Sequence, residues 1–218
     1  MIIAGVDEAG IGCWAGPMVV VTAAFDEATK LPPDIRDSKR LSMDQRENLI
    51  DDIYSRAEWV IIKMAKPELI NVSGGIWELW DLMVGQLLEE NRRRSAGRII
   101  VDGERMIPSF KGAVYEAKAD DKYREVSAAS IIAKYVQTCA MEDLHEKYRS
   151  FCFNQHHGYG TALHKHWLER LGPTPAHRLA YRPVAAYLAQ NPKKYQELRQ
   201  LTLFKPEVET TVIERKTR

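Results

Sequence analysis

The sequence predicts a single α/β domain. Short apolar runs rich in β-branched residues alternate with longer segments whose apolar residues recur at helical spacing, as in strands packed against helices. A length of 218 residues is enough for one such domain with a buried core. Three of the predicted strands end in acidic residues, which would gather carboxylates where neighbouring strands end.

The first predicted strand opens the chain and runs into the adjacent acids Asp7 and Glu8. Neighbouring strand residues point to opposite faces, so both acids can share one site only if the backbone turns there. Gly10 and Gly12 permit such a turn. Buried acids need a partner, so the pair indicates a bound cation; a strand that ends in solvated acids is the alternative.

The later elements follow from the same patterns. Residues 17–25 form an apolar run that we expect to make a hairpin with the first strand. Ser42 and Gln45 form a capping box at a helix start. Residues 67–75 are predicted to be irregular, and the apolar stripe of the next helix, which includes Trp77, is assigned to the core. Further strands are expected at 58–65, 98–101 and 112–118, and further helices at 76–94, 126–148, after 161, at 184–190 and at 193–199.

Composition excludes several classes of protein. The net charge of +1 gives no overall basic field, so any surface that binds nucleic acid must be local. The 3 cysteines have no metal-binding or paired spacing and predict reduced thiols. No apolar run is long enough to cross a membrane, and the first residues do not resemble a signal peptide. We therefore expect a cytoplasmic protein that does not bind membranes.

The acids at the strand ends carry the chemistry. They are Asp7 with Glu8, Asp102, and Asp120 with or without Asp121. Two unit charges about 4 Å apart repel by roughly 4 kcal/mol at an effective dielectric constant near 20, so a cation is required. Ligands that are all oxygen select Mg²⁺ or Mn²⁺, and two such ions can support in-line phosphodiester hydrolysis. The pattern favours a nuclease or phosphoryl-transfer enzyme, although Ca²⁺ sites and solvated strand ends look similar.

Six ordered motifs resemble ribonuclease HII, over about the first 190 residues. They are GVDEAGxGxxAGP at 5–17, DSKRLS at 37–42, VDG at 101–103, KADxxxxxVSAASIIAK at 118–134, GYGT at 158–161 and GPTPAHR at 172–178.

The resemblance implies a ribonuclease H-like fold with a mixed five-stranded sheet flanked by helices and a helical C-terminal region. The implied catalytic domain spans residues 1–190, followed by a polar tail at 191–218. The implied activity is cleavage of RNA in RNA-DNA hybrids and at ribonucleotides embedded in duplex DNA, leaving 3'-hydroxyl and 5'-phosphate ends. By the same resemblance, two Mg²⁺ or Mn²⁺ ions bind the catalytic acids, which are Asp7, Glu8, Asp102 and Asp120. Asp121 is assigned as a solvated neighbour.

The resemblance also assigns substrate contacts. Tyr159 would stack on the sugar at the DNA side of the scissile junction, where a 2'-hydroxyl would be left without a partner. Ser38, Lys39 and Arg40 would lie near backbone phosphates, which fixes register without reading sequence. From the residues alone, the first interpretation of Tyr159 is an anchor for its loop, and the basic triplet could be a solvated turn.

One position departs from the family pattern. Gly10-Ile11-Gly12 stands where the family has Gly-Arg-Gly, a turn that approaches the ribose 2'-hydroxyl. Ile11 offers no charge or side-chain donor, so we hypothesise a weaker preference for a single embedded ribonucleotide. The alternatives are hybrid-preferring specificity like that of ribonuclease HIII, or a catalytically idle module that binds hybrids. Intact acids argue against the idle module.

Several histidines fall in the second half of the chain. They have no tetrahedral spacing with the cysteines, so a zinc site is not favoured, although one of them could touch substrate. These histidines are His156, His157, His164 and His166.

The tail holds a short candidate interaction motif. The pentapeptide from Gln200 through Leu201, Leu203 and Phe204 resembles the QLxLF sequence by which bacterial proteins bind the sliding clamp. Its apolar side chains would fill a pocket, and Gln200 would supply a polar anchor. The alternative is that they cover the domain's own surface. We otherwise expect a monomer.

Overall fold

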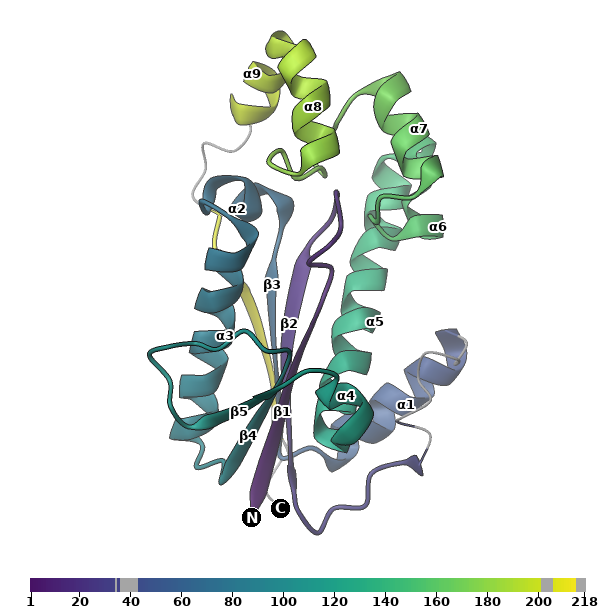
Figure 1. Ribbon diagram of the computed structural model, residues 1–218. Helices are drawn as coiled ribbons and strands as arrows, with labels where there is room; N and C mark the ends of the chain where they lie inside the picture. The colour runs from purple at the N-terminus through teal and green to yellow at the C-terminus, as the bar shows by residue number, and fades with distance from the viewer. Residues whose placement is uncertain (34, 36–42, 201–205, 215–218) are drawn as a thin grey trace.

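The computed structural model describes residues 1–33, 35, 43–200 and 206–214. Within these ranges the chain forms one mixed sheet of six strands with the order β5-β4-β1-β2-β3-β6, covered by helices on both faces (Figure 1). The strands are β1 (Ile2–Ala9), β2 (Met18–Asp26), β3 (Trp59–Ala65), β4 (Arg98–Asp102), β5 (Ala113–Glu116) and β6 (Glu209–Glu214).

The central pairings follow from the buried apolar pattern. β1 and β2 form the predicted antiparallel hairpin, and β2 pairs antiparallel with β3. β1 also lies parallel to β4, with Val6 opposite Val101, and β4 lies parallel to β5. Parallel neighbours end at the same side of a sheet, so the acids that follow Val6 and Val101 come to one place.

Different helices cover the two faces of the sheet. One core cluster packs β1–β3 and β4 against α3, and the other packs the reverse face against α1 and α5. Because strand side chains alternate, β1, β2 and β3 each contribute residues to both clusters. The helices on these faces are α1 (Met43–Arg56), α2 (Pro67–Val72), α3 (Ile76–Arg93), α4 (Ala119–Lys122) and α5 (Arg124–Lys147).

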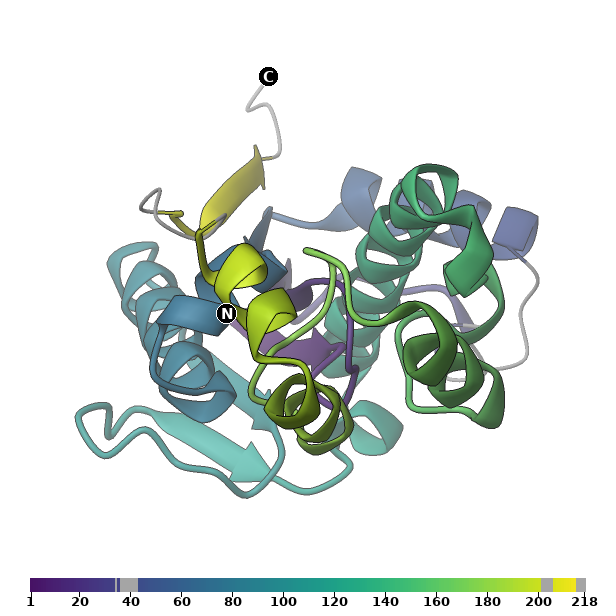
Figure 2. The same cartoon turned by 90° about the horizontal axis from the view of Figure 1, so that it is seen from above.

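The remaining helices gather at one end of the sheet (Figures 1 and 2). They are α6 (Phe153–His156), α7 (Ala162–Leu171), α8 (Arg182–Gln190) and α9 (Pro192–Gln200), after the 3-10 turn Arg149–Phe151. The loop between β1 and β2 is tied to this end: Trp14 N–H donates to Gly158 O at 2.8 Å, and Gly16 N–H donates to Ala176 O at 2.9 Å. None of the helices in the described ranges has the length and apolar character needed to span a bilayer.

Three features differ from the sequence predictions. Residues expected to be irregular form α2, which starts with Pro67 in the first turn, where its missing N–H costs nothing. Trp77, assigned to the core, is 46% exposed, whereas its neighbour Trp80 is buried. The guanidinium of Arg105 lies 5.2 Å from the Trp77 ring, which occupies a solvent-facing edge of α3.

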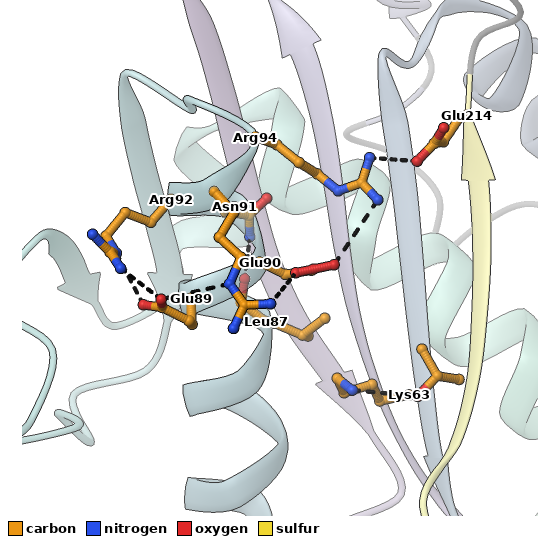
Figure 3. Close-up of polar contacts among 10 residues, drawn as sticks. Lys63, Leu87, Glu89, Glu90, Asn91, Arg92, Arg94 and Glu214 are labelled. Carbon is orange, nitrogen blue, oxygen red and sulfur yellow. Dashed lines mark hydrogen bonds and ion pairs between the residues drawn. The ribbon is translucent and has the colours of Figure 1, made fainter.

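The sixth strand is the third difference, because the resemblance implied five. β6 lies antiparallel to β3 at the sheet edge, with Val212 opposite Ile61. Two side-chain contacts fasten its ends (Figure 3): Arg94 Nη1 lies 2.5 Å from Glu214 Oε1, and Lys63 Nζ donates to Thr210 Oγ1 at 3.3 Å. The region expected to be a polar tail therefore returns to the catalytic sheet.

Candidate active site

Asp7 and Glu8 lie near the end of β1 and point to opposite sides of the sheet. Both pair in register with β2, opposite Val21 and Val20, so the strand continues through the acid pair. The turn that Gly10 and Gly12 permit follows β1, where Cys13 N–H donates to Gly10 O at 3.2 Å, and it does not bring the two acids to the same face. Strand alternation places Asp7 on the face covered by α5, where it is buried. Glu8 lies on the α3 side and accepts a hydrogen bond from Trp80 Nε1 at 3.2 Å.

Asp102 and Asp120 reach the same end of the sheet from other elements. Asp102 ends β4, one residue beyond the Val6–Val101 pair, and its Oδ1 accepts a 2.6 Å hydrogen bond from Ala119 N–H. That bond places α4 beside the strand end, so Asp120, the second residue of α4, follows directly. Three separate elements thus deliver the four predicted acids.

Burial and mutual repulsion raise the pKa values of Asp7, Glu8 and Asp102. Burial raises the pKa of Asp7 to about 8, and the charge of Glu8 adds to the shift. The pKa of Glu8 rises to about 6, first through burial; Asp102 and Asp120 contribute, and the Trp80 hydrogen bond opposes the shift. Burial also raises the pKa of Asp102. The four acids therefore act on one another electrostatically, and a cation among them would favour their charged forms.

The donor set fits a hard divalent cation. All four side chains offer only oxygen, and buried carboxylates that repel one another need a positive charge. Among the described residues, no three His, Cys, Asp or Glu side chains stand close enough to hold one ion as they are placed. Holding a metal therefore requires the carboxylates to turn toward one another.

Three neighbours of the acids had no predicted role. Trp80 bonds to Glu8, the ammonium of Lys134 partly offsets the rise in the Glu8 pKa, and the Ser130 hydroxyl opposes the rise in the Asp7 pKa. Ser130 and Lys134 both belong to α5 and to the SAASIIAK motif. A hydroxyl and a lysine one helical turn apart signal a polar stripe on that helix, which could have pointed to them.

The Gly10-Ile11-Gly12 turn is held in place by hydrogen bonds from Arg178. This arginine is fully buried; its Nε donates to Gly16 O at 3.0 Å and its Nη1 donates to Ile11 O at 3.0 Å. The Tyr181 hydroxyl donates to the same Ile11 carbonyl. Gly10 has φ +87°, and a Cβ there would lie 2.6 Å from a backbone oxygen, so glycine is required. The Ile11 side chain packs against the α3-side core.

Tyr159 stands beside this turn. It is 50% exposed, and a Cβ on Gly12 would lie 3.9 Å from its ring. The two glycines that flank it allow close packing, because a Cβ on Gly158 would lie 2.2 Å from Ala15 O and one on Gly160 would lie 2.1 Å from the Trp14 ring. The structure thus brings the predicted Tyr159 and the glycine turn together.

The other predicted contacts cannot be placed. Ser38, Lys39 and Arg40 lie outside the described residues, as does the candidate clamp segment after Gln200, which is the last residue of α9. Of the histidines, His156 and His164 are buried rather than presented to substrate, and His166 is exposed on α7.

Comparison with known proteins decides the family. The family model described as Ribonuclease HII matches residues 4–184 of the chain. The chain belongs to the ribonuclease HII family. Ribonuclease HII of Thermotoga maritima is 36% identical over 190 residues, which cover 87% of this chain and 77% of that protein.

Solved structures agree with this assignment. Ribonuclease H2 from Pyrococcus horikoshii matches with a TM-score of 0.73 at 28% identity, over 88% of this chain and 100% of that one. RNase HII in a PCNA complex from Archaeoglobus fulgidus matches with a TM-score of 0.69 at 29% identity, over 84% and 96%. The ribonuclease H-like fold and the resemblance are therefore confirmed. The protein is a ribonuclease H-type endonuclease of a family that depends on divalent metal.

Proposed function

We propose that this enzyme cleaves the RNA strand of RNA-DNA hybrids and the 5' side of ribonucleotides embedded in duplex DNA, leaving 3'-hydroxyl and 5'-phosphate ends. The observation that supports this is that β1 and β4 bring three desolvated acids, Asp7, Glu8 and Asp102, to one end of the sheet, where α4 adds Asp120. Asp7, Glu8, Asp102 and Asp120 would hold two Mg²⁺ or Mn²⁺ ions. When bound, such ions activate a water and stabilise the leaving oxygen.

The protein's own groups prepare this site. Trp80 orients Glu8 through the indole N–H, and the N–H of Ala119 orients Asp102. Lys134 supplies the positive charge that acts on Glu8. Orienting groups of this kind hold carboxylates in a productive geometry and reduce the conformational entropy that is lost when substrate binds.

Tyr159 and the glycine turn would read the sugars at the cleavage junction. The half-exposed ring of Tyr159 lies beside Gly12, so a deoxyribose stacked on it would place the preceding ribose near the backbone of the turn. Ser38, Lys39 and Arg40 would contact backbone phosphates.

Ile11 supports a second candidate specificity, preference for longer hybrids. Its side chain packs against the α3-side core, and its carbonyl is occupied by Arg178 and Tyr181. It therefore brings no charge to a lone ribonucleotide, and contacts spread over a longer hybrid would contribute more of the binding.

The test is cleavage of two labelled duplexes, one with a single ribonucleotide and one a full RNA-DNA hybrid, with Mg²⁺ or Mn²⁺. Asp7→Asn should lower the rate about a thousandfold in both, because losing a metal ligand removes several kcal/mol of transition-state stabilisation. Asp121→Asn, an exposed neighbour of Asp120, should leave the rate unchanged.

The products then decide between the specificities. Efficient cutting 5' to the lone ribonucleotide supports the broad activity, and cutting of the hybrid alone supports the narrower one. No metal-dependent cutting of either duplex, or equal rates with Asp7→Asn, would refute the proposal.

We also propose that Gln200, Leu201, Leu203 and Phe204 bind the bacterial sliding clamp. Two observations support this: the sequence match, and the fact that a relative of similar fold, RNase HII of Archaeoglobus fulgidus, was solved in complex with PCNA. Because β6 returns to the sheet after this segment, point substitutions test it better than deletion.

In that test, a variant with Leu203→Ala and Phe204→Ala should lose co-elution with the clamp and keep full activity on short duplexes. Thr202→Ala, at the variable position of the motif, is the matched control. Unchanged co-elution of the double variant would exclude this binding mode.

A further inference from the structure

Two buried histidines form a hydrogen-bond chain that ends on the backbone of Tyr159. His177 and His164 are both fully buried. His177 Nδ1 lies 3.0 Å from Thr174 N, the Nε2 atoms of the two histidines are 3.2 Å apart, and His164 Nδ1 lies 2.9 Å from Tyr159 O. The chain spans residues from the GPTPAHR motif to the GYGT motif.

The partners at its two ends fix the tautomers. Thr174 N–H can only donate, so His177 Nδ1 accepts and its proton lies on Nε2. That proton is donated to His164 Nε2, which leaves the His164 proton on Nδ1, facing the Tyr159 carbonyl. Burial lowers the pKa of His177 to about 3 and that of His164 to about 4, so both rings are neutral. Every bond in the chain then has one donor and one acceptor.

The surroundings leave these rings little freedom. His164 stacks on His156 with ring centroids 4.4 Å apart, and lies 5.3 Å from the Trp14 ring. His156 in turn accepts from Gly158 N–H through Nδ1 at 3.3 Å. The backbone on either side of Tyr159 is therefore held by imidazoles, whereas the tyrosine ring itself is exposed.

We propose that His177 and His164 are positioning residues that set where the Tyr159 ring stands relative to the Gly10–Gly12 turn. The proposal rests on the proposed contact of Tyr159 with the sugar. Both termini of the chain are backbone groups, so the histidines act through the loop and not on the reacting atoms. A ring displaced by about 1 Å would align the scissile phosphate poorly, and such misplacement can cost up to about a hundredfold in rate.

Zinc binding does not account for this cluster. Each ring nitrogen of His156, His164 and His177 already has a partner within 3.3 Å. Within the part of the chain that the structure describes, these histidines also join no group of three candidate metal ligands.

Two amide substitutions of His164 separate its two bonds. The side-chain amide of asparagine superposes on Nδ1, so His164→Asn keeps a donor to the Tyr159 carbonyl. The longer glutamine places its amide at Nε2, so His164→Gln keeps the contact with His177 and loses the donor. We expect His164→Gln to lower kcat/KM on the single-ribonucleotide duplex about tenfold, and His164→Asn to restore most of it. His166→Asn and His166→Gln, on the exposed side of the same helix, are matched controls that should change nothing.

A double-mutant cycle with Tyr159→Ala distinguishes positioning from general stability. If His164 acts through Tyr159, His164→Gln should have no further effect once the ring is removed. Equal activity of the Asn and Gln variants, or an undiminished effect of Gln in the Tyr159→Ala background, would overturn the proposal.

A binding measurement keeps this test independent of cleavage. In the Asp7→Asn background, fluorescence anisotropy with the labelled single-ribonucleotide duplex should show the same ranking, with His164→Gln and Tyr159→Ala weaker and His164→Asn close to its parent. A wild-type enzyme that cleaves neither duplex would refute the proposed function and leave this ranking as the test of positioning. Identical affinities across the set would refute the positioning role.

Discussion

The acid site and the loop anchor lie close together but satisfy their polar groups in opposite ways. We use loop anchor for His156, His164, His177, Arg178 and Tyr181. In the acid site, the carboxyl groups of Asp7, Glu8 and Asp102 are desolvated, and burial together with the charge of Glu8 raises the pKa of Asp7 to about 8. In the loop anchor, all six imidazole nitrogens have partners within 3.3 Å.

The difference reflects what each region does. The acid site destabilises the metal-free protein, because its desolvated carboxyl groups are balanced only when a cation binds. The loop anchor contributes stability and holds two loops, the Gly10–Gly12 turn and the Tyr159 loop, near those acids. Desolvated acids at the centre are thus surrounded by imidazoles whose ring nitrogens are all hydrogen-bonded, a division typical of catalytic sites.

The largest effect is expected from replacing the buried carboxyl group of Asp7. The pKa of Asp7 is raised from 3.8 to about 8, so the folded state holds a proton that the unfolded state releases between these values. The stability from this proton is present below about pH 4 and is lost as the pH rises through 8. Asp7→Asn should therefore raise the free energy of unfolding in EDTA at pH 7, by on the order of 3–4 kcal/mol.

Urea denaturation at pH 5 and pH 7.5 measures this effect. The difference between wild type and variant should grow with pH, and Mg²⁺ should stabilise the wild type more than Asp7→Asn. Asp121→Asn is the exposed control. A variant less stable than wild type at pH 7.5 would show that the acid site is not the strained region.

Removing Arg178 should have the next largest effect, with the opposite sign. Arg178→Met leaves the carbonyl of Gly16 without a buried donor, at about 1–3 kcal/mol, and removes one of the two donors to the Ile11 carbonyl. Because Tyr181 still donates to Ile11 O, we expect a total loss of about 3 kcal/mol in the free energy of unfolding. Arg182→Met, four residues along and exposed, should cost little. Equal urea midpoints for the two variants would contradict the anchor role.

Each of the two buried histidines should make the protein less stable in acid, by less than the loss expected for Arg178→Met. Burial lowers the pKa of His164 to about 4 and of His177 to about 3, below the ordinary 6.5. Below pH 6.5 the unfolded state binds protons that the folded state does not bind. The free energy of unfolding is therefore highest above pH 6.5 and falls as the pH drops toward the folded-state pKa values. Each histidine should lower the free energy of unfolding by about 2 kcal/mol between pH 6.5 and pH 5.

The Asp7→Asn background isolates this effect, since the Asp7 shift has the opposite sign. There, adding His164→Phe should flatten the fall in unfolding free energy between pH 6.5 and 5, and adding His166→Phe should not. Parallel pH profiles for the two would mean that the buried histidines do not titrate on unfolding.

Much of the acid site could be predicted from the sequence because each acid follows a strongly apolar strand. The sequence patterns of β1 and β4 predict strands, and the acids at their ends lie near one another because the two strands are parallel neighbours. The placement of Asp120 required more: Lys118 takes a left-handed φ of 57°, which starts the short helix α4 directly after β5. A lysine gives no sign of that conformation, since glycine or asparagine is the usual signal.

The edge strand and the loop anchor show why the rest was missed. β6 holds a run of β-branched residues, Thr210 to Ile213, but a mostly exposed strand lacks the alternating burial that marks a strand in sequence. His164 lies in the first turn of α7 and His177 follows 13 residues later, beyond the end of that helix, so only the packed fold shows that they meet. Local patterns find elements and strand ends, whereas side-chain networks depend on tertiary packing.

The smallest effect concerns Ile11, which lies where the two regions meet. Its carbonyl belongs to the loop anchor, while its side chain replaces the arginine of the family pattern. Ile11→Arg keeps the carbonyl and would add a cation beside the proposed position of the scissile phosphate, where a charge-assisted contact of about 1 kcal/mol corresponds to about fivefold. We expect the ratio of kcat/KM for the single-ribonucleotide duplex over the hybrid to rise by about that factor. Ile11→Met, which keeps an apolar side chain, should leave the ratio unchanged. If Ile11→Arg and Ile11→Met give the same ratio, the specificity lies in the backbone of the turn, which Arg178 and Tyr181 hold, and the arginine of the family pattern contributes only to general affinity for phosphate.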